Sequence, residues 1–391
     1  MKRLVVLGST GSIGENTLRL VESQSERFQI VGLAARRNGK RLLEQARQFN
    51  VPVVALSEPG GEEGNATVAE LKHSGRKVIT GSNASADLLS ACDFDLVMHG
   101  ITGAAGLPAS HECLRLGKPL ALANKESLVV AGELLTSLSL KTGAPILPVD
   151  SEHSAIFQCV RFEPKAKIRK IYLTASGGPF RDRDISTFDT ITRAEALAHP
   201  NWNMGERITI GSATMMNKAF EVVEAHYLFH LAPAQIHVLI HRQSIVHSMV
   251  EFVDASMLAQ LGIPDMRVPI QVALHHPDRA PFALDPFDPV KFANLTFSEV
   301  EPRRYPAVQL GYQTIQLGGT AGAILNASDE IATIRFLEND LSFVDIARLC
   351  ADALERVSVM KADSLETILD ADRRAREFAR TWSPPAAVRV L

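Results

Sequence analysis

The stretch RLVVLGSTGSIG, residues 3–14, combines a short apolar run with glycines at positions 8, 11 and 14. The run is typical of a buried strand, and the residues that follow have the apolar spacing of a helix. Glycine allows a tight strand-to-helix turn and a close approach to a pyrophosphate, whose charge is attracted by the free N–H groups at the helix start. The spacing is GxxGxxG, whereas GxGxxG is more common. Because a tight turn that binds nothing could use the same glycines, the motif alone predicts a βα unit and only favours a dinucleotide site.

Strand and helix patterns alternate over residues 1 to about 150. The strand-like runs are RLVVLG (3–8), FQIVGLA (28–34), VPVVAL (51–56) and FDLVMHG (94–100), and the helical stretches include ENTLRLVESQ (15–24) and KRLLEQARQF (40–49). This alternation is typical of βαβ units and a parallel sheet. We therefore predict a Rossmann-like dinucleotide-binding domain over residues 1–150.

The rest of the chain changes character twice. Residues 151–285 contain strand-like KIYLTAS (170–176) and QSIVHSMVEFV (243–253) around a polar, glycine-rich passage, which predicts a central α+β catalytic domain. A proline-rich linker is expected over 286–311. Helical apolar spacing in residues 320–339 and 342–357 then predicts a small C-terminal helical bundle over 312–391. The expected class is α/β with these three parts.

Bulk composition points to a small-molecule ligand. Of 391 residues, 41 are basic and 44 acidic, so the net charge of −3 favours neither nucleic acid nor an anionic membrane as a partner. No apolar run approaches the roughly 18 residues of a membrane helix. Four cysteines without CxxC spacing fit neither a disulfide framework nor a zinc site and suit a reducing compartment. We expect a cytoplasmic enzyme.

The second predicted strand ends in ARRN, residues 35–38, where an NAD-binding protein usually places an acid for the ribose 2′-OH. The guanidinium groups of Arg36 and Arg37 suit a 2′-phosphate instead. They could also be a solvated helix start. Beside the glycine loop they favour NADP(H).

Acidic residues gather in LPVDSEHSAI, residues 147–156. If this segment is the end of a strand, Asp150 and Glu152 lie on one face, and their mutual repulsion calls for a hard cation such as Mg²⁺ or Mn²⁺. Alternatively, Asp150 or Ser151 caps a helix that begins near Glu152. The role of His153 stays open between lining the site and supporting the carboxylates.

A third acid that favours the metal interpretation lies in SATMMNKAFEVVEAHY, residues 212–227. There Asn217 and Glu221 share a helix face with Lys218 beside it. An amide, an ammonium and a carboxylate together suit a phosphate or polyol held next to a metal. Glu224 and His226 could belong to the same group, but surface positions are expected for them.

The loop HPNWNMG, residues 199–205, places Trp202 and Met204 among Pro, Asn and Gly. It resembles a lid that closes apolar surface over a ligand, near residues 199–209. A tryptophan that anchors the loop to the core is the alternative.

Seven motifs in order, GSTGSIG, ANKESLV, PVDSEHSAIFQ, LTASGGPF, HPNWNMG, SATMMNK and LGIPDMRVPI, together resemble the 1-deoxy-D-xylulose 5-phosphate reductoisomerase family. The likeness runs from residue 1 into the helical C-terminus, where ILNASDEIA also fits. It implies the rearrangement of 1-deoxy-D-xylulose 5-phosphate and its reduction by NADPH to 2-C-methyl-D-erythritol 4-phosphate, in isoprenoid precursor biosynthesis by the methylerythritol phosphate pathway. It also implies Mg²⁺ or Mn²⁺, with Co²⁺ a further candidate, and a homodimer.

The resemblance carries over residue by residue. The implied NADPH contacts are Thr10, Gly11, Ser12, Ile13, Arg36, Arg37, Asn38, Asn124, Glu126 and Gly205. The implied metal ligands are Asp150, Glu152 and Glu221. The implied substrate contacts are Lys125, Ser151, Glu152, Ser176, His199, Trp202, Ser212, Asn217, Lys218 and Glu221, of which Ser176, Ser212, Asn217 and Lys218 gather the phosphate. The expected catalytic residues are Lys125, Glu152 and His199.

The chain departs from the family pattern at two places. It has Arg36-Arg37 where Gly-Lys is frequent, which keeps positive charge near the 2′-phosphate. It has Gly211 where an Asp is frequent. The resemblance therefore does not predict the hydrogen bonds around this position, because glycine has no carboxylate.

Two other functions have to be weighed. An NADPH-dependent semialdehyde or homoserine-type dehydrogenase also joins a glycine-loop domain to an α+β domain, but the semialdehyde type needs a nucleophilic cysteine in a reactive context. A cofactor-binding regulator without catalysis would not need the metal and lid residues.

Overall fold

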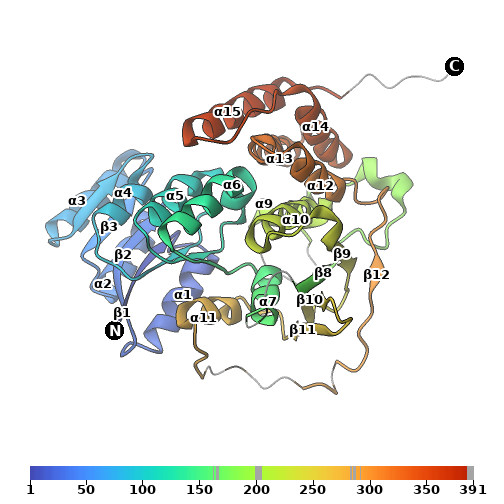
Figure 1. Cartoon of the computed structure of the whole chain (residues 1–391). Helices are drawn as coiled ribbons and strands as arrows, with labels where there is room; N and C mark the ends of the chain where they lie inside the picture. The colour runs from blue at the N-terminus through green and yellow to red at the C-terminus, as the bar shows by residue number, and fades with distance from the viewer. Residues whose placement is uncertain are drawn as a thin grey trace. The chain divides into compact units, whose positions relative to one another are not determined.

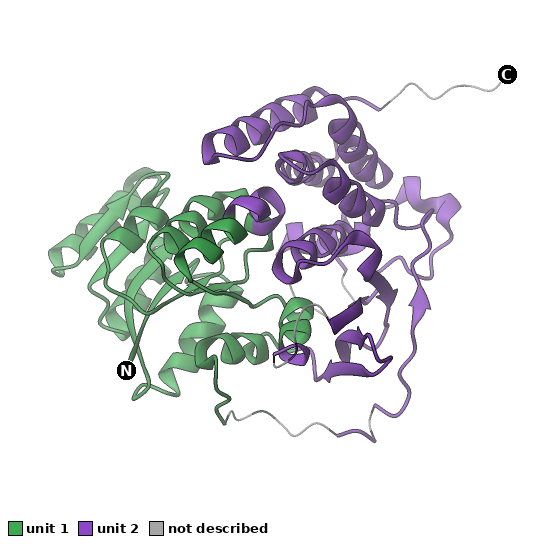
Figure 2. Cartoon of the chain, in the orientation of Figure 1, with its two compact units in different colours: residues 1–127, 135–157, 265–286 green, residues 128–134, 158–264, 287–391 purple. Residues whose placement is uncertain are grey.

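The computed structural model describes residues 1–161, 163, 167–198, 205–281, 284, 288–290 and 292–384. The chain forms two compact units (Figure 2). Unit 1 comprises residues 1–127, 135–157 and 265–286, and unit 2 comprises residues 128–134, 158–264 and 287–391. None of the described helices combines the length and apolar character needed to cross a membrane.

Unit 1 is built on a seven-stranded sheet in which every strand pairs in parallel with its neighbour (Figure 1). Its strands are β1 (Lys2–Leu7), β2 (Phe28–Ala35), β3 (Val53–Leu56), β4 (Lys77–Thr80), β5 (Leu96–His99), β6 (Leu120–Leu122) and β7 (Ile146–Pro148). The spatial order is β4-β3-β2-β1-β5-β6-β7. The order along the chain therefore reverses between β1 and β5, and in open α/β sheets the crevice at this reversal is where ligands bind.

Helices follow the strands of unit 1, as the alternating pattern predicts. They are α1 (Ser12–Glu22), α2 (Gly39–Gln48), α3 (Gly61–His73), α4 (Ala84–Ser90), the 3₁₀ turn η1 (Ala104–Gly106), α5 (Leu107–Arg115), α6 (Lys125–Thr142), α7 (Ser151–Cys159) and α11 (Arg267–His275). Unit 1 includes residues 265–286, of which 265–285 were predicted as part of the central domain. The reason is packing, since Ile270, Ala273 and Leu274 of α11 are buried in the same core as β1 and β2.

Helix α6 is divided between the units. Its residues 128–134 belong to unit 2, and Ala131 has non-helical backbone angles (φ −139°, ψ 33°) that mark a kink inside the helix. Gly322 packs closely against residues 128–134, because a Cβ at Gly322 would lie 1.8 Å from the carbonyl oxygen of Val129. The kinked turn is therefore part of the packing of unit 2.

Unit 2 contains a five-stranded mixed sheet with the order β11-β10-β8-β9-β12 (Figure 1). Its strands are β8 (Ile168–Ala175), β9 (Ile236–Ile240), β10 (Val246–Phe252), β11 (Met257–Leu261) and β12 (Ser298–Glu299). The β8–β9 pair is parallel, and the other pairs are antiparallel. The strands predicted at 170–176 and 243–253 are thus confirmed as β8 and β10.

The remaining elements of unit 2 are helical. The elements between β8 and β9 are the 3₁₀ turn η3 (Ile185–Thr190), α8 (Arg193–Ala196), α9 (Glu206–Thr214), α10 (Met216–Phe229) and η4 (Pro233–Gln235), and those at the C-terminus are α12 (Ala307–Leu317), α13 (Ala321–Leu337), α14 (Phe343–Arg356) and α15 (Leu365–Thr381). The predicted C-terminal helical part is confirmed. Strand β12 and the first residues of helix α12, 307–311, fall inside the segment predicted as a linker.

The hydrophobic core of unit 2 ties the C-terminal helices to the polar passage after β8. Phe343 of α14 packs edge-on against Phe180, with ring centroids 5.2 Å apart, and both belong to a buried cluster that includes Ile210 of α9. The C-terminal helices therefore support the backbone on both sides of the predicted lid.

Candidate functional site

The glycine loop occupies the reversal point of the unit 1 sheet. Gly8 has φ of +73°, and a Cβ there would lie 2.6 Å from the carbonyl oxygen of Gly100, the residue after β5. A Cβ at Gly14 would lie 2.4 Å from the Cα and carbonyl oxygen of Ser9. Both positions therefore require glycine, which places the start of α1 directly over the loop.

The first turn of α1 is available to an anion. Gly11 is its N-cap residue and provides no side-chain cap, and Gly11 and Ser12 are exposed. Gln45 of α2 fixes the loop from behind, because its side chain accepts from Ser9 Oγ (2.8 Å) and donates to the carbonyl oxygen of Ser9 (2.9 Å). An uncapped helix start behind a rigid glycine loop suits a diphosphate. The predicted residues Thr10, Gly11, Ser12 and Ile13 lie here.

Arg36 and Arg37 follow the end of β2 and are exposed. Both bind the carboxylate of Glu58, with Arg36 Nε 2.7 Å from Oε1 and Arg37 Nε 2.8 Å from Oε2. Hydrogen bonds from Arg36 first, and then from Arg37, lower the pKa of Glu58. Asn38 caps α2 by accepting from the backbone N–H of Arg41 (3.1 Å). The sequence did not single out Glu58, and no motif marks it.

Asn124 and Glu126 lie at the start of α6 and are buried. Asn124 Nδ2 donates to the carbonyl oxygens of Ile101 (2.7 Å) and Gly103 (3.0 Å), and Glu126 Oε1 accepts from the backbone N–H of Gly103 (2.9 Å). These two predicted cofactor contacts therefore hold the loop after β5, which is the second side of the ligand crevice at the reversal point.

The acidic segment after β7 differs from the strand-end geometry that the sequence suggested. Strand β7 ends at Pro148 and α7 begins at Ser151, so Glu152 lies in the first turn of a helix and Asp150 immediately precedes it. The premise that both carboxylates share a strand face is therefore wrong, and the helix expected to begin near Glu152 is present. Ser151 Oγ donates to Glu152 Oε2 over 2.6 Å.

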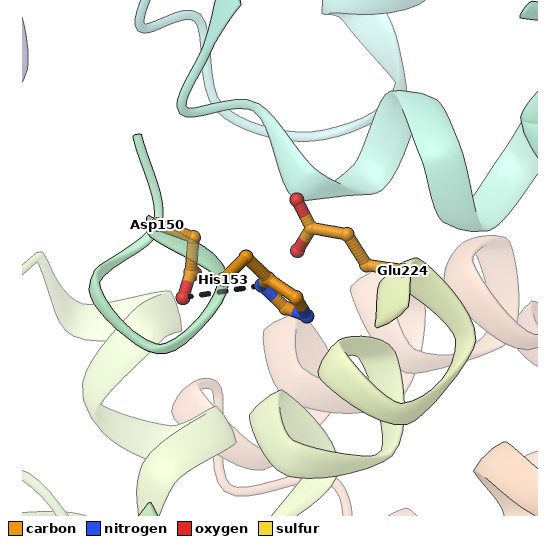
Figure 3. A group of neighbouring side chains, drawn as sticks. All are labelled: Asp150, His153 and Glu224. Atoms are coloured by element: carbon orange, nitrogen blue, oxygen red, sulfur yellow. Dashed lines mark ion pairs between the residues drawn. The ribbon is translucent and has the colours of Figure 1, made fainter. Parts of the chain in front are cut away.

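The side chains of Lys125 and His153 in unit 1 face Asp150. The Lys125 ammonium forms an ion pair with its carboxylate, and His153 Nδ1 lies 3.5 Å from its Oδ1 (Figure 3). Burial raises the pKa of Asp150, but Lys125 and His153 outweigh this effect and hold the pKa well below its usual range. His153 is fully buried. Unit 1 thus brings together Lys125, Asp150, Ser151, Glu152 and His153, and His153 supports a carboxylate.

In unit 2, Asn217, Lys218 and Glu221 of α10 form one group, as their spacing predicts. Asn217 Nδ2 donates to Glu221 Oε1 (2.7 Å), and the Lys218 ammonium pairs with the other oxygen of Glu221. Lys218 Nζ also donates to the carbonyl oxygen of Thr174 in β8 (2.7 Å). Lys218 and Glu221 are buried, so an amide and an ammonium orient a carboxylate inside the protein.

The two serines predicted to contact phosphate come from segments that pack on each other. Gly177 and Gly178, which follow Ser176, both have positive φ, and a Cβ at Gly178 would lie 2.9 Å from the carbonyl oxygen of Ser212. Ser176 Oγ accepts from the backbone N–H of Gly178 (3.2 Å). Two glycines therefore let the loop after β8 approach the C-terminal half of α9.

Five residues that the sequence singled out remain. Gly205 precedes α9 and is exposed, whereas His199 and Trp202 lie outside the described residues. Glu224 of α10 was expected at the surface, and this expectation is wrong because its side chain is fully buried. His226 is half-buried, with Nδ1 2.6 Å from the carbonyl oxygen of Leu231.

Three models of one family match successive parts of the chain. The 1-deoxy-D-xylulose 5-phosphate reductoisomerase model matches residues 4–132, and two models of the C-terminal domain match residues 146–229 and 261–378. Among curated relatives, the 1-deoxy-D-xylulose 5-phosphate reductoisomerase of Anaeromyxobacter sp. (strain K) is 46% identical over 379 residues, which cover 97% of this chain and 96% of the relative. That of Thermodesulfovibrio yellowstonii is 42% identical over 381 residues, covering 97% and 99%.

Solved structures agree with these relatives. The reductoisomerase from Zymomonas mobilis in complex with NADPH is 38% identical and superposes with a TM-score of 0.89. A DOX-P reductoisomerase in complex with NADPH, fosmidomycin and magnesium is 36% identical and superposes with a TM-score of 0.91. Both similarities cover 97% of this chain and 98% of the other. The chain therefore belongs to the 1-deoxy-D-xylulose 5-phosphate reductoisomerase family.

Proposed function

We propose that the protein converts 1-deoxy-D-xylulose 5-phosphate into 2-C-methyl-D-erythritol 4-phosphate by a metal-dependent isomerisation followed by reduction with NADPH. This reaction serves the formation of isoprenoid precursors. The single observation that carries the proposal is the similarity over nearly the whole chain to a solved reductoisomerase that binds NADPH, fosmidomycin and magnesium.

NADPH supplies the hydride for the reduction when it is bound. In unit 1 the uncapped start of α1 would hold its diphosphate through the N–H groups of residues 10–13, and Arg36, Arg37 and Asn38 would hold the 2′-phosphate. Asn124 and Glu126 would position the loop after β5 against the cofactor. Gly205 is a further cofactor contact that the resemblance implies.

The divalent cation would be held by Asp150, Glu152 and Glu221. The acidic residues fit a hard cation, because Asp150 Oδ1 is buried and accepts no hydrogen bond from the described part of the chain, while Lys125 keeps the carboxylate ionised. Magnesium is the proposed metal, and Mn²⁺ and Co²⁺ are candidates with the same oxygen ligands. A bound cation would stabilise negative charge on the substrate oxygens.

The substrate phosphate would lie on the glycine loop after β8. Ser176, Ser212, Asn217 and Lys218 supply hydroxyl, amide and ammonium donors, and the backbone approach at Gly178 supports this use. Lys125, Ser151 and Glu152 would face the reacting carbons, with Glu152 moving a proton. His199, as a further catalytic and substrate contact, and Trp202, in the lid near residues 199–209, remain parts of the proposal carried by the resemblance.

A homodimer is the proposed assembly. Strand β11 is an edge of the unit 2 sheet, and its side chains Met257, Leu258 and Leu261 are between 40% and 50% exposed. A hydrophobic edge strand is normally covered, and a second copy of the chain would cover it symmetrically. The expected result is a dimer mass by light scattering and a monomer when Leu258 is replaced by Lys.

The cysteines support an intracellular enzyme that does not use a thiol nucleophile. All four are free, and burial raises the pKa of Cys92 and Cys159 to about 11. Such thiols are protonated at neutral pH and react slowly, which disfavours the semialdehyde dehydrogenase alternative. We therefore propose the cytoplasm as the compartment.

The test is an absorbance assay of NADPH oxidation with 1-deoxy-D-xylulose 5-phosphate and Mg²⁺ or Mn²⁺. We expect oxidation that requires both substrate and metal, with 2-C-methyl-D-erythritol 4-phosphate as the product by mass spectrometry and NMR. Absence of metal-dependent oxidation, from protein that binds NADPH, would refute the reaction. Oxidation driven by homoserine or an aspartate semialdehyde analogue would favour the dehydrogenase alternative.

A further inference from the structure

A carboxylate lies at the centre of the basic pair that follows β2. Glu58, two residues after the end of β3, binds Arg36 through one oxygen and Arg37 through the other, at 2.7 and 2.8 Å. Both arginines were assigned to the 2′-phosphate of NADPH, whereas Glu58 has no role in that assignment. An acid beside a phosphate site needs a physical explanation, because it repels the ligand.

The backbone fixes Glu58 at this place. After the strands end, the ladder between them continues, since Ser57 N–H donates to the carbonyl oxygen of Ala35 (3.1 Å) and Glu58 N–H donates to that of Arg36 (2.8 Å). Gly39 N–H donates to the carbonyl oxygen of Arg37 (2.8 Å), so the start of α2 is held as well. The backbone of Glu58 is therefore fixed at the carboxyl edge of the sheet, and its half-exposed side chain is held by the two arginines.

The arginine side chains gain orientation from this carboxylate. Their side chains are 67% and 72% exposed, so packing restrains them little. Two adjacent guanidinium groups also repel each other, and each loses rotamer entropy when it is ordered. Glu58 contacts the Nε side of both groups, which leaves further N–H donors on each for an anion.

We propose that Glu58 is a positioning residue that holds Arg36 and Arg37 together as one receptor for the 2′-phosphate and thereby determines the preference for NADPH over NADH. The inference rests on the proposed function. The cluster of two cations and one anion keeps a net charge of +1, so attraction for a phosphate dianion remains. Ordering before binding reduces the entropy lost on binding, which is the general benefit of preorganisation.

The test compares Glu58→Gln with the wild-type enzyme in cofactor binding, without substrate or metal. The probes are NADPH and NADH by their fluorescence, and adenosine 2′,5′-bisphosphate against 5′-AMP by displacement. We expect NADPH and the bisphosphate to bind about tenfold more weakly, which corresponds to about 1.4 kcal/mol. NADH and 5′-AMP should change by less than about twofold, and kcat at saturating NADPH should stay unchanged.

Glu44→Gln is the matched control. Glu44 pairs with Arg41 on the same helix α2 (2.9 Å), so this variant removes an equal charge without touching Arg36 or Arg37. It should bind both cofactors as the wild type does. The Glu58→Asp variant should restore part of the selectivity, because it restores the charge.

Two results would overturn the inference. Unchanged or tighter NADPH binding by Glu58→Gln would mean that the carboxylate only opposes the phosphate, and an equal loss for NADH would indicate general damage. The proposed function fails separately, if wild-type protein that binds NADPH does not turn over 1-deoxy-D-xylulose 5-phosphate.

Discussion

Replacing Gly14 with alanine should displace the start of α1 from the glycine loop. A Cβ at this position would lie 2.4 Å from both the Cα and the carbonyl oxygen of Ser9, and 2.5 Å from the carbonyl oxygen of Gly8. All three atoms are backbone, so no side chain can rotate away. Ordinary contact requires a separation of about 3.4 Å or more. The helix start therefore has to move by about 1 Å relative to the loop.

This displacement has two measurable consequences. Overpacking of this kind costs about 1–3 kcal/mol of folding free energy. A 1 Å misplacement of binding groups can weaken their function about a hundredfold, so the Kd and KM for NADPH should rise by about that factor. The KM for 1-deoxy-D-xylulose 5-phosphate should change much less, because its proposed contacts lie elsewhere. Denaturant unfolding, fluorescence titration with NADPH and steady-state kinetics give the three quantities.

Gly11→Ala is the matched control for stability. Gly11 has φ of −90°, and a Cβ there would have one neighbour, the carbonyl oxygen of Gly8 at 3.4 Å. Its unfolding free energy should therefore stay within about 0.5 kcal/mol of the wild type. If Gly14→Ala were as stable as Gly11→Ala and bound NADPH with wild-type affinity, the account of the loop would be wrong.

Three further predictions concern other parts of the chain. Burial lowers the pKa of His99 to about 4. Between pH 7 and pH 5, His99 therefore takes up a proton in the unfolded state, where its pKa is the ordinary 6.5, but not in the folded state. The free energy of unfolding should fall by about 2 kcal/mol over this range. Urea unfolding should show this decrease in the wild type, and the decrease should be absent in His99→Gln. Gly211→Ala should raise the unfolding free energy by about 0.5–1 kcal/mol, because the position lies inside α9 and its Cβ would be 3.7 Å from Asn217, an ordinary contact. Glu221→Gln should raise the Mg²⁺ concentration needed for half-maximal rate at least about tenfold and leave NADPH binding nearly intact; full activity at low Mg²⁺ would contradict the metal assignment.

Elements whose structure depends on residues close together in the sequence could be predicted. The turn from β1 to α1 needs glycine at positions 8 and 14 for reasons within one βα unit, and the alternation of strands and helices that follows reflects side-chain periodicity. The assignment of residues 265–286 to unit 1 was not predictable, because it depends on which core buries Ile270 and Leu274. Glu58 is a comparable case, since its contact with Arg36 and Arg37 depends on the pairing of β3 with β2.

In the acidic segment after β7 the predicted secondary structure is wrong, but the argument for positive charge near the two carboxylates does not depend on it. A period of two was assumed for Asp150 and Glu152, yet the strand ends at Pro148 and a helix begins at Ser151. Two acids within three positions need compensating positive charge at a strand end and at a helix start alike. The expected positive charge therefore follows from residue type more than from the strand period. Lys125 provides part of it within unit 1.

In helix α10, the surface position expected from the sequence and the burial in the structure disagree. Glu224 was expected at the surface because polar residues usually mark the solvent side of a helix, yet Lys218, Glu221 and Glu224 are all buried. Burying charged groups is costly even when they are paired, and a well-packed apolar replacement is often as stable or more so. Stability alone therefore gives no reason for three ionisable residues inside one helix. For Lys218 and Glu221, the requirement for a carboxylate oriented by an amide and an ammonium does give one, and this requirement is chemical.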